Sequence, residues 1–527
     1  MTIAHWKPAV KPSKDEERIL ARLKTHRKLY AFLRLHRHEI IDDEFQDLLT
    51  TMYRDTGAGA PPQPPGLMCM VLLLQEYDGV SDREAVERSV DSNRWQMVLD
   101  CLGDEEPAFS QGGLQQFRER MIAKDMDIKL LERTVEVARR AKSFDWKKLP
   151  KNLRVAMDSR PLVGAGRVED TFNLLGHAAR KIAECAAKQT GLTFERVCDL
   201  AHAPVLKASS IKAGLDVDWS DQREKDDALQ TLVIQVRSLS EWVGRIMGGE
   251  GLDGPITKYI EALQQVQEQN IDEVNGHISM RQGVAEDRRV SIEDEDMRHG
   301  RKSKSHRFNG YKEHIASDLD NGVILACAIT SANVPEEEAA PLLKADIEAQ
   351  GYTVRELDID RGYLNSKIVD EIEAAGGEVL CKPWPTRSAK GLFTKQDFDI
   401  DARAGTITCP AGEVERFEPG ATVEFDPEAC GGCRLRAQCT HSASGRGRTI
   451  HVAADESRQQ RLRELRATPA GRMRLRGRTT VEHDLARVSA RKGRRARYRG
   501  KRKNTFHLRR TSAVQNLEAA QRAMFAS

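Results

Sequence analysis

Residues 307 to 380 alternate between strand and helix patterns with short links, and this order most constrains the fold. The turn "LDNG" separates "EHIASD" from the buried run "VILACAI", which predicts a hairpin. A helix is predicted over residues 336–350, with acids in its first turn and Gly351 at its end. "YTVRELDID", "NSKIVDEIEAAGG" and "EVLCK" then predict a strand, a helix and a further strand. Such short links imply parallel pairing, so the sequence predicts an α/β fold with a mixed sheet flanked by helices.

Two of the predicted strands end on an aspartate. "NLRVAMD" alternates apolar and polar residues and ends on Asp158, and "YTVRELDID" does the same and ends on Asp360. If the two strands are neighbours, both carboxylates lie at the carboxyl edge of the sheet, where open α/β sheets bind their ligands. Aspartate also closes strands simply because it suits turns. Asp170 competes with Asp158 for a functional role, and Asp358 competes with Asp360.

A later helix, "RTTVEHDLARV", carries a third acid, Glu482. Its apolar residues recur at i, i+4 and i+7 and would lay it against the sheet: they are Val481, Leu485 and Val488. Three neighbouring carboxylates repel one another, and divalent cations such as Mg²⁺ remove that repulsion. Two such ions about 4 Å apart suit in-line phosphoryl transfer. Nearby alternatives for the third acid are Glu456, Glu464 and Asp484.

The segment from residue 472 to 510 is strongly basic. It holds sixteen Lys and Arg against two acids, although the whole chain has a net charge of only +3. Such concentration favours a polyanionic partner over an ordinary solvated surface. Arg478 precedes Glu482 by one helical turn and either holds a phosphate or pairs with an acid. Trp384 is predicted to pack in the core, with stacking on a splayed base as the alternative. The candidate DNA-binding residues are Arg478, Arg494, Arg495, Arg497, Arg499, Lys501 and Lys503.

A short segment rich in Gly, Pro and Cys precedes this basic part. Its four cysteines are Cys409, Cys430, Cys433 and Cys439. One Cys-x2-Cys pair with two further thiols suits tetrahedral Zn²⁺, and His441 is an alternative ligand. Buried structural cysteines are the competing interpretation.

The longest apolar run, "GLMCMVLLL" from Gly66 to Leu74, is too short to cross a bilayer. The first residues lack the apolar stretch of a signal peptide. We therefore expect a cytoplasmic protein without membrane contact, associated with the nucleoid when it binds DNA. Its ten cysteines are then reduced thiols or metal ligands.

These motifs together resemble the RNase H-like DDE transposases of bacterial insertion sequences, in the group whose third motif reads Tyr-x2-Arg-x3-Glu-x6-Lys. "MDSR" is similar to the first-Asp motif, "DIDRGYLNS" to the second, and "RTTVEHDLARV" to the Glu helix. "CGGCRLRAQC" is similar to a Cys insertion of some members, and "PPQPPGLMCMVLLLQEYDGVSDREAVER" to the N-terminal helical domain. The chain departs from the pattern at Leu475 (Tyr position), Ser489 (Lys position) and Arg160 (a small residue). Lys492 or Arg491, one turn further along, are candidate substitutes for the missing Lys.

The resemblance implies an RNase H-like core divided by insertions. We expect an N-terminal helical domain for DNA binding or assembly at residues 1–145, and a catalytic core at 146–176 and 286–400. A helical insertion would occupy 177–285, and a Cys-rich, zinc-like insertion 401–450. The Glu-bearing helix and the basic segment would occupy 451–527.

The resemblance also implies an activity. Asp158, Asp360 and Glu482 would hold two Mg²⁺ or Mn²⁺ ions, and the four cysteines one Zn²⁺. The protein would hydrolyse DNA and transfer strands at element ends. Its partners would be double-stranded DNA, as terminal inverted repeats and target, and a second copy of itself in a DNA-bound homodimer. The alternatives are an RNase H-like nuclease without strand transfer and an inactive DNA-binding regulator.

Overall fold

The computed structural model describes residues 3–23, 26–53, 61–142, 149–248, 254–385, 391–443 and 445–525. The described residues form three separate hydrophobic cores. The largest is shared by the N-terminal helices, the central sheet and the C-terminal helices. The second lies within a helical insertion, and the third, much smaller, within the Cys-rich segment. In the described residues we find no helix with the length and apolar character that a membrane crossing requires.

The central sheet has six strands and is mixed, as predicted. Its order is β4-β5-β1-β7-β8, and β6 pairs with β5. β1, β7 and β8 run parallel, whereas β5 is antiparallel to β1 and to β6, with which it forms the predicted hairpin. The strands are β1 (Asn152–Val163), β4 (Arg298–Arg301), β5 (Arg307–Asp318), β6 (Val323–Ser331), β7 (Thr353–Asp358) and β8 (Glu378–Leu380). The connecting helices are η3 (Glu336–Ala339), α14 (Ala340–Ala349), η4 (Arg361–Tyr363) and α15 (Lys367–Ala374).

The N-terminal part consists of helices, and α4 at its centre is buried on nearly all sides because its sequence is apolar all round. Helix α5 begins with a capping box of Ser81 and Glu84. The helices are α1 (Lys14–Leu23), α2 (Lys28–Ile40), α3 (Asp43–Thr50), α4 (Pro65–Asp78), α5 (Asp82–Asp91), α6 (Asn93–Leu99), α7 (Gln111–Ala123) and α8 (Met126–Lys142).

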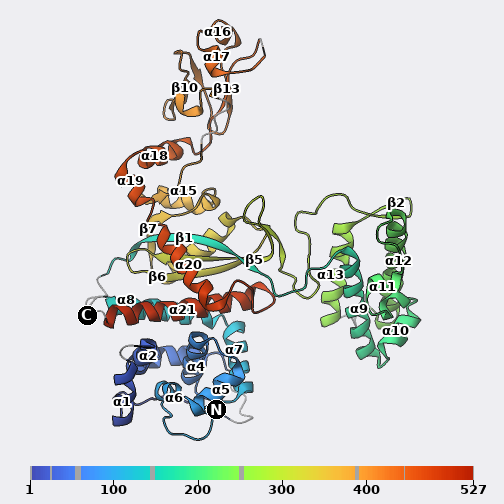
Figure 1. Ribbon diagram of the computed structural model, residues 1–527, viewed down its shortest axis with the longest axis vertical. Coiled ribbons are helices and arrows are strands. Elements are labelled where there is room, and N and C mark those ends of the chain that lie inside the picture. Colours follow the sequence, from blue (N-terminus) through green and yellow to red (C-terminus); the bar gives the residue numbers. More distant parts are fainter. Residues whose placement is uncertain are drawn as a thin grey trace.

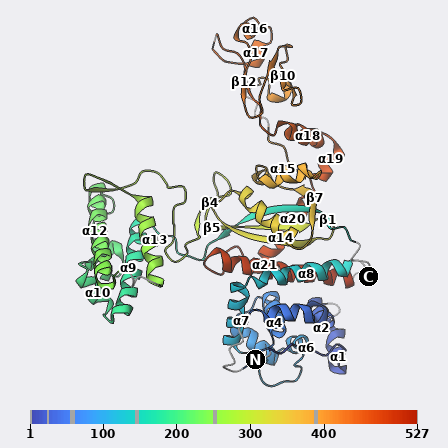
Figure 2. The ribbon, with the colours of Figure 1, turned by 180° about the vertical axis from the view of Figure 1, so that it is seen from behind.

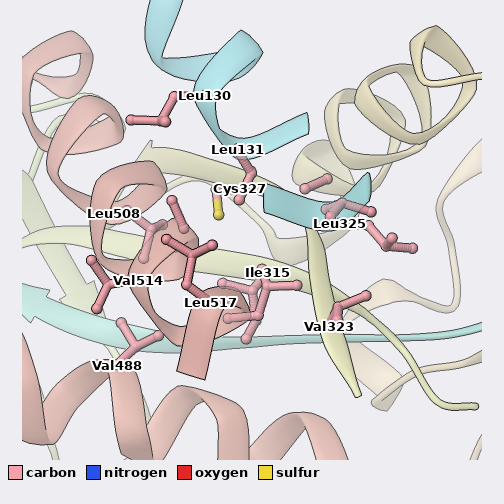
Figure 3. Close-up of a cluster of buried hydrophobic side chains, with 14 of the residues drawn as sticks. Leu130, Leu131, Ile315, Val323, Leu325, Cys327, Val488, Leu508, Val514 and Leu517 are labelled. Carbon is pink, nitrogen blue, oxygen red and sulfur yellow. The ribbon is translucent and has the colours of Figure 1, made fainter. Parts of the chain in front are cut away.

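Two helices from the C-terminal part complete the core: α20 (Thr479–Lys492) and α21 (Lys501–Phe525). Helix α20 packs on β1 and β5, and α21 lies beside α8 between the sheet and the N-terminal helices (Figures 1 and 2). Figure 3 shows how their side chains meet: Leu508, Val514 and Leu517 of α21 face Ile315 of β5 and Val488 of α20. The basic segment is thus followed by a core helix that the sequence did not reveal.

The segment between β1 and β4 forms a helical insertion that stands to one side of the sheet (Figures 1 and 2). Its own hydrophobic core joins the faces of its long helices. Its elements are α9 (Thr171–Thr190), α10 (Phe194–Leu200), η2 (Pro204–Lys207), α11 (Ile211–Leu215), α12 (Gln222–Met247), α13 (Pro255–Asn270), β2 (Ile271–Val274) and β3 (His277–Met280).

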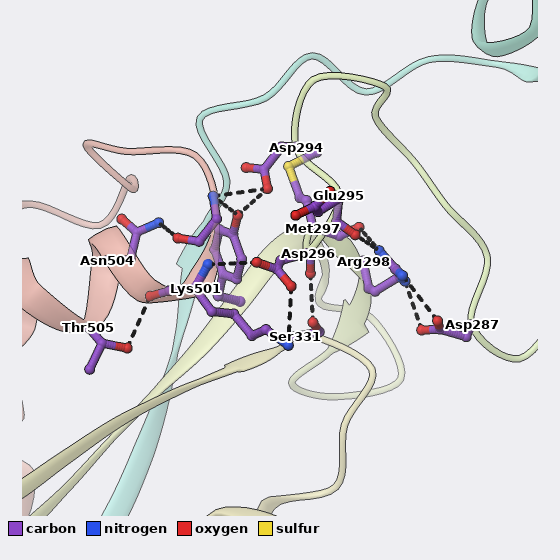
Figure 4. Close-up of polar contacts among 12 residues, drawn as sticks. Asp287, Asp294, Glu295, Asp296, Met297, Arg298, Ser331, Lys501, Asn504 and Thr505 are labelled. Carbon is purple, nitrogen blue, oxygen red and sulfur yellow. Dashed lines mark hydrogen bonds and ion pairs between the residues drawn. The ribbon is translucent and has the colours of Figure 1, made fainter. Parts of the chain in front are cut away.

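The segment that returns from the insertion to the sheet contacts the start of α21 (Figure 4). Asp296 Oδ2 accepts the backbone N–H of Lys501 at 2.8 Å, and Asp294 Oδ1 accepts that of Gly500 at 3.2 Å. The first N–H groups of a helix lack partners within the helix, so carboxylates stabilise them. The return segment therefore fixes where α21 begins.

The Cys-rich segment lies at the far end of the molecule from the N-terminal helices (Figure 1). It consists of short strands and single helical turns. These are η5 (Lys395–Asp397), β9 (Asp399–Asp401), β10 (Thr406–Thr408), β11 (Val414–Arg416), β12 (Thr422–Glu424), α16 (Pro427–Gly431), α17 (Arg436–Cys439) and β13 (Thr449–His451). Two helices, α18 (Glu456–Ala467) and α19 (Pro469–Arg474), lead from it back to α20.

Candidate active site

Strand register brings Asp158 and Asp360 to the same edge of the sheet. β1 and β7 are parallel, and Ala156 lies opposite Asp358. β1 does not end at Asp158, as the sequence predicted, but continues to Val163, with Asp158 opposite Ile315 of β5. Asp360 comes two residues after the end of β7, so the two aspartates lie near the same edge of the paired strands. Asp360 is exposed and accepts the backbone N–H of Arg361 at 2.8 Å, which starts the turn η4.

Asp358, the competitor of Asp360, lies deeper. Its side chain is buried, and its carboxyl oxygens have no hydrogen-bond partner among the described residues. Burial raises the pKa of Asp358 to about 7, with the nearby charge of Glu356 adding to the effect. Gly477 packs so close that a Cβ at that position would lie 2.8 Å from Asp358 Oδ2. Asp358 thus sits beneath the loop that precedes α20, whereas Asp360 faces solvent.

Glu482 reaches Asp158 through Arg478. Arg478 Nη1 lies 3.2 Å from Asp158 Oδ2, and Arg478 Nη2 donates to Glu482 Oε1. The pKa of Asp158 is raised to about 6, chiefly by burial; Arg478 opposes this rise, and the charges of Glu482 and Asp360 contribute to it. Two carboxylates therefore meet on one guanidinium, and Asp360 lies near enough for its charge to act on Asp158. Arg478 pairs with acids here, as one of its two predicted roles required.

The other predicted competitors are engaged elsewhere. Asp484 is buried beneath α20 and accepts hydrogen bonds from Ser317 at 2.8 Å and Gln515 at 3.0 Å. Glu456 is buried in ion pairs with basic side chains near the Cys-rich segment. Asp170 caps helix α9 of the insertion. Of the acids on α20, Glu482 alone interacts with Asp158.

The departures from the transposase motif have structural roles in this chain. Lys492 Nζ lies 2.7 Å from Glu313 Oε2, and both side chains are buried. Arg160, two residues after Asp158, lies 2.5 Å from Glu313 Oε1 and donates to the backbone carbonyl of Leu485 at 3.2 Å. Arg491 pairs with an acid of α21. These cations hold α20 against β1 and β5, so neither candidate substitute for the missing Lys reaches the carboxylates.

The three carboxylates have the chemistry that Mg²⁺ prefers, which is oxygen ligands with negative charge. Within the described parts of the chain, no three acidic, His or Cys side chains are close enough together to hold an ion. Arg478 is the only described cation within ion-pair distance of Asp158 or Glu482. The site therefore carries more negative than positive charge.

The predicted basic residues lie along the end of β1. The N–H of Val163 donates to the carbonyl of Arg494 at 3.0 Å, and the N–H of Ala496 donates to the carbonyl of Val163 at 2.7 Å. These two bonds form an isolated β-bridge that holds residues 494–496, the basic strand, against the end of β1. Arg499 pairs with Glu293, and Lys501 pairs with Asp296 at 3.1 Å. Of the predicted basic residues, those that are exposed and have no ion pair among the described residues are Arg494, Arg495, Arg497 and Lys503.

The four cysteines line one cavity of about 350 Å³ in the Cys-rich segment. Cys433 Sγ accepts the backbone N–H of Leu435 at 3.4 Å. Burial and the neighbouring thiols raise the pKa of Cys439. His441, the predicted alternative ligand, is exposed and does not line the cavity.

Trp384 does not pack in the core, so that prediction is wrong. Its side chain is 48% exposed. The guanidinium carbon of Arg361 lies 5.5 Å from the ring centroid, a cation–π distance. Arg361 directly follows Asp360, so an exposed aromatic ring flanks the carboxylate site.

Two family models match this chain. The model described as "Transposase DDE domain" matches residues 408–520, which contain Arg478, Glu482 and the four cysteines. The model described as "Transposase domain (DUF772)" matches residues 20–120 in the N-terminal helices. No curated protein and no solved structure matches the chain. With the mixed sheet that places acids at one edge, these matches identify the chain as a DDE transposase of insertion-sequence type.

Proposed function

We propose that this transposase cuts DNA at insertion-sequence ends and joins the ends to target DNA, with Asp158, Asp360 and Glu482 as its catalytic carboxylates. The observation that carries the proposal is the meeting of Asp158 and Glu482 on one guanidinium, that of Arg478, at the sheet edge where Asp360 leaves β7. Carboxylates contributed by distant parts of a chain and gathered with a net negative charge suit metal-dependent phosphoryl transfer.

Two reactions of the same type follow from this proposal. In the first, the oxygen of water bonds to phosphorus and the bond to the 3′ oxygen breaks, which leaves a 3′-OH and a 5′-phosphate. In the second, that 3′-OH attacks a target phosphodiester and releases a new 3′-OH. Two Mg²⁺ ions, or Mn²⁺, held by the three carboxylates would stabilise the negative charge on the phosphate oxygens.

The protein's own groups would then orient the DNA. Once the acids are neutralised, the Arg478 guanidinium is available to hold a phosphate, which it can contact through two parallel N–H groups. The exposed Arg494, Arg495, Arg497 and Lys503 would contact the backbone of the terminal repeats or the target. In this proposal two copies act together on DNA in the cytoplasm, at the nucleoid.

The test is a cleavage and joining assay on element-end DNA with and without Mg²⁺. The parent protein should release 3′-OH ends and join them to a target plasmid, and Asp158→Asn, Asp360→Asn and Glu482→Gln should do neither while still binding the DNA. Cleavage without joining would identify a nuclease. Binding without cleavage by the parent would identify a DNA-binding regulator and overturn the proposed catalysis.

A structural Zn²⁺ in the Cys-rich segment is our second proposal, with Cys409, Cys430, Cys433 and Cys439 as ligands. The four thiols share one cavity, and the hydrophobic core around them has only seven buried residues. A core of that size rarely holds a small module together without a metal or disulfides. Elemental analysis should give one zinc per chain in the parent and none in Cys433→Ser; a zinc-free parent that is fully folded would contradict the proposal.

A further inference from the structure

Glu336, at the start of η3, lies between the chain segments that follow the two aspartates. Its Oε1 accepts a hydrogen bond from the hydroxyl of Ser159, the residue after Asp158. Its Oε2 lies against Gly362, since a Cβ built at that position would be 2.0 Å away. One carboxylate therefore contacts both β1, at Ser159, and the turn η4, at Gly362.

Each of these two segments also holds its aspartate directly. The N–H of Ser159 donates to Asp158 Oδ1 at 2.8 Å, and the N–H of Arg361 donates to Asp360 Oδ1 at 2.8 Å. Ser159 is fixed within β1 by its pairing with His314 of β5, whereas Arg361 lies in the turn η4 beyond the end of β7. A shift of η4 relative to β1 would therefore move Asp360 relative to Asp158.

The inner side of the turn η4 is fixed by a buried chain of hydrogen bonds. Tyr363 is fully buried, and its hydroxyl lies 2.7 Å from His314 Nδ1. His314 Nε2 lies 2.9 Å from the hydroxyl of Thr330 on β6. On the outer side Glu336 fills this role, and in the described residues it has no ion pair that would draw its carboxylate elsewhere.

We propose that Glu336 is a positioning residue that holds the turn η4, which follows Asp360, at a fixed separation from β1 at Ser159. This inference rests on the proposed function, because it concerns the geometry of the same carboxylates. Glu336 acts through its acceptor oxygen and its size, so glutamine, which keeps both, replaces it well. Alanine removes the bridge and lets η4 move away from β1.

The experiment is a Mg²⁺ titration of end-DNA cleavage by the parent, Glu336→Gln, Glu336→Ala, Ser159→Ala and the Ser159→Ala/Glu336→Ala double variant. Removing residues that orient metal ligands typically costs about 10- to 100-fold. We expect Glu336→Ala and Ser159→Ala each to lower cleavage by about that factor and to need more Mg²⁺, and the double variant to be no worse than Glu336→Ala. Glu336→Gln should stay within about threefold of the parent. Glu338→Ala, an exposed acid of the same turn, is the matched control.

Gly362→Ala supplies an independent arm. The added methyl group collides with the Glu336 carboxylate, so Gly362→Ala should by itself lower cleavage. Combined with Glu336→Ala, it should lower cleavage no further than Glu336→Ala does. Parent-like cleavage by Glu336→Ala, loss in Glu336→Gln equal to that in Glu336→Ala, or additive losses in the double variants would each overturn the inference. Melting temperature and DNA binding identify any variant that has not folded. If Glu336→Ala is such a variant, the cleavage rates of Glu336→Gln and Ser159→Ala test the inference. A parent that does not cleave, or an Asp158→Asn variant that does, would count against the proposed function instead.

Discussion

The carboxylate edge and the Cys-rich segment both gather candidate metal ligands from separate parts of the chain, but they hold them differently. Asp158 lies on β1 and Asp360 follows β7, two paired strands of a six-stranded sheet, and the largest core of the molecule supports that sheet. The four cysteines lie on turns and short strands around a small core. Backbone pairing thus fixes the strands that carry the aspartates, whereas the zinc that we propose would fix the thiols. The comparison predicts that removing metal abolishes activity but spares the fold at the first site, and unfolds the second.

The largest effect should come from Glu482→Gln. It keeps the shape and hydrogen bonding of the side chain but removes the charge that a metal clamp requires. We expect cleavage to fall by several orders of magnitude, with the melting temperature and end-DNA affinity close to those of the parent. A gel-based cleavage assay beside a binding assay measures both.

Glu464→Gln, on the exposed side of α18, is the control and should remain within a few fold of the parent. An inactive Glu464→Gln together with an active Glu482→Gln would show that the third carboxylate has been misplaced.

The second-largest effect should come from a chelator, which should unfold the Cys-rich segment but not the central sheet. Structural zinc contributes directly to folding free energy, so its removal should unfold the Cys-rich segment. We expect limited proteolysis to cut within residues 391–452 after chelation, while the central sheet remains protected. If residues 391–452 resist proteolysis in a protein shown to contain no zinc, the Cys-rich segment does not need a metal to fold and the predicted difference between the two regions is wrong.

The third-largest effect should come from breaking the buried ion pairs of Glu313, which hold α20 against the sheet. Glu313→Gln would leave Arg160 and Lys492 buried with no acid between them, and breaking such a buried pair costs about 3–5 kcal/mol. Denaturant unfolding should show a decrease of that size in the free energy of unfolding. Glu371→Gln, whose partner Lys344 lies 3.2 Å away at the surface, should cost less than about 1 kcal/mol. Equal effects of the two substitutions would mean that the buried cluster does not brace α20.

The smallest effect should come from the basic strand. Neutralising Arg494, Arg495 and Arg497 leaves the backbone pairing with Val163 intact, so both regions should fold as before. End-DNA affinity should fall, and the slope of log K against log salt should flatten by roughly 0.9 for each phosphate that the strand no longer neutralises. Unchanged slopes would assign the strand to an ordinary solvated surface.

Local patterns predicted much of the fold and the candidate aspartates. The hairpin, the parallel strands and the candidates Asp158 and Asp360 follow from alternation and turn residues, although β1 continues past Asp158 to Val163. Alternation alone does not choose between Asp358 and Asp360, because both lie on one face of the strand; the resemblance to the transposase motif favoured Asp360. Only the pairing of Asp358 with Ala156 and the approach of Gly477 show which carboxylate is buried.

Helix α21 could not be predicted as a core helix, because its buried residues do not form an apolar pattern in the sequence. Its buried face includes polar and charged residues whose partners lie far away in the sequence, as Arg510 does with Glu76 and Gln515 with Asp484. Glu336 was missed for the same reason: an acid in a first helical turn is ordinary, and its contact with Ser159 exists only in the folded chain. The periodicity of the sequence does not predict long-range polar contacts of this kind.

The position of α20 in the chain has a consequence for biosynthesis. Arg160 on β1 contacts the carbonyl of Leu485, a residue made 325 positions later. At roughly 5–20 residues per second, a ribosome needs about 15 to 65 s to bridge that interval. During this time β1 has left the ribosome while α20, which packs on it, has not yet been made. Glu482 reaches the site last, so a chain still being translated has no complete set of carboxylates.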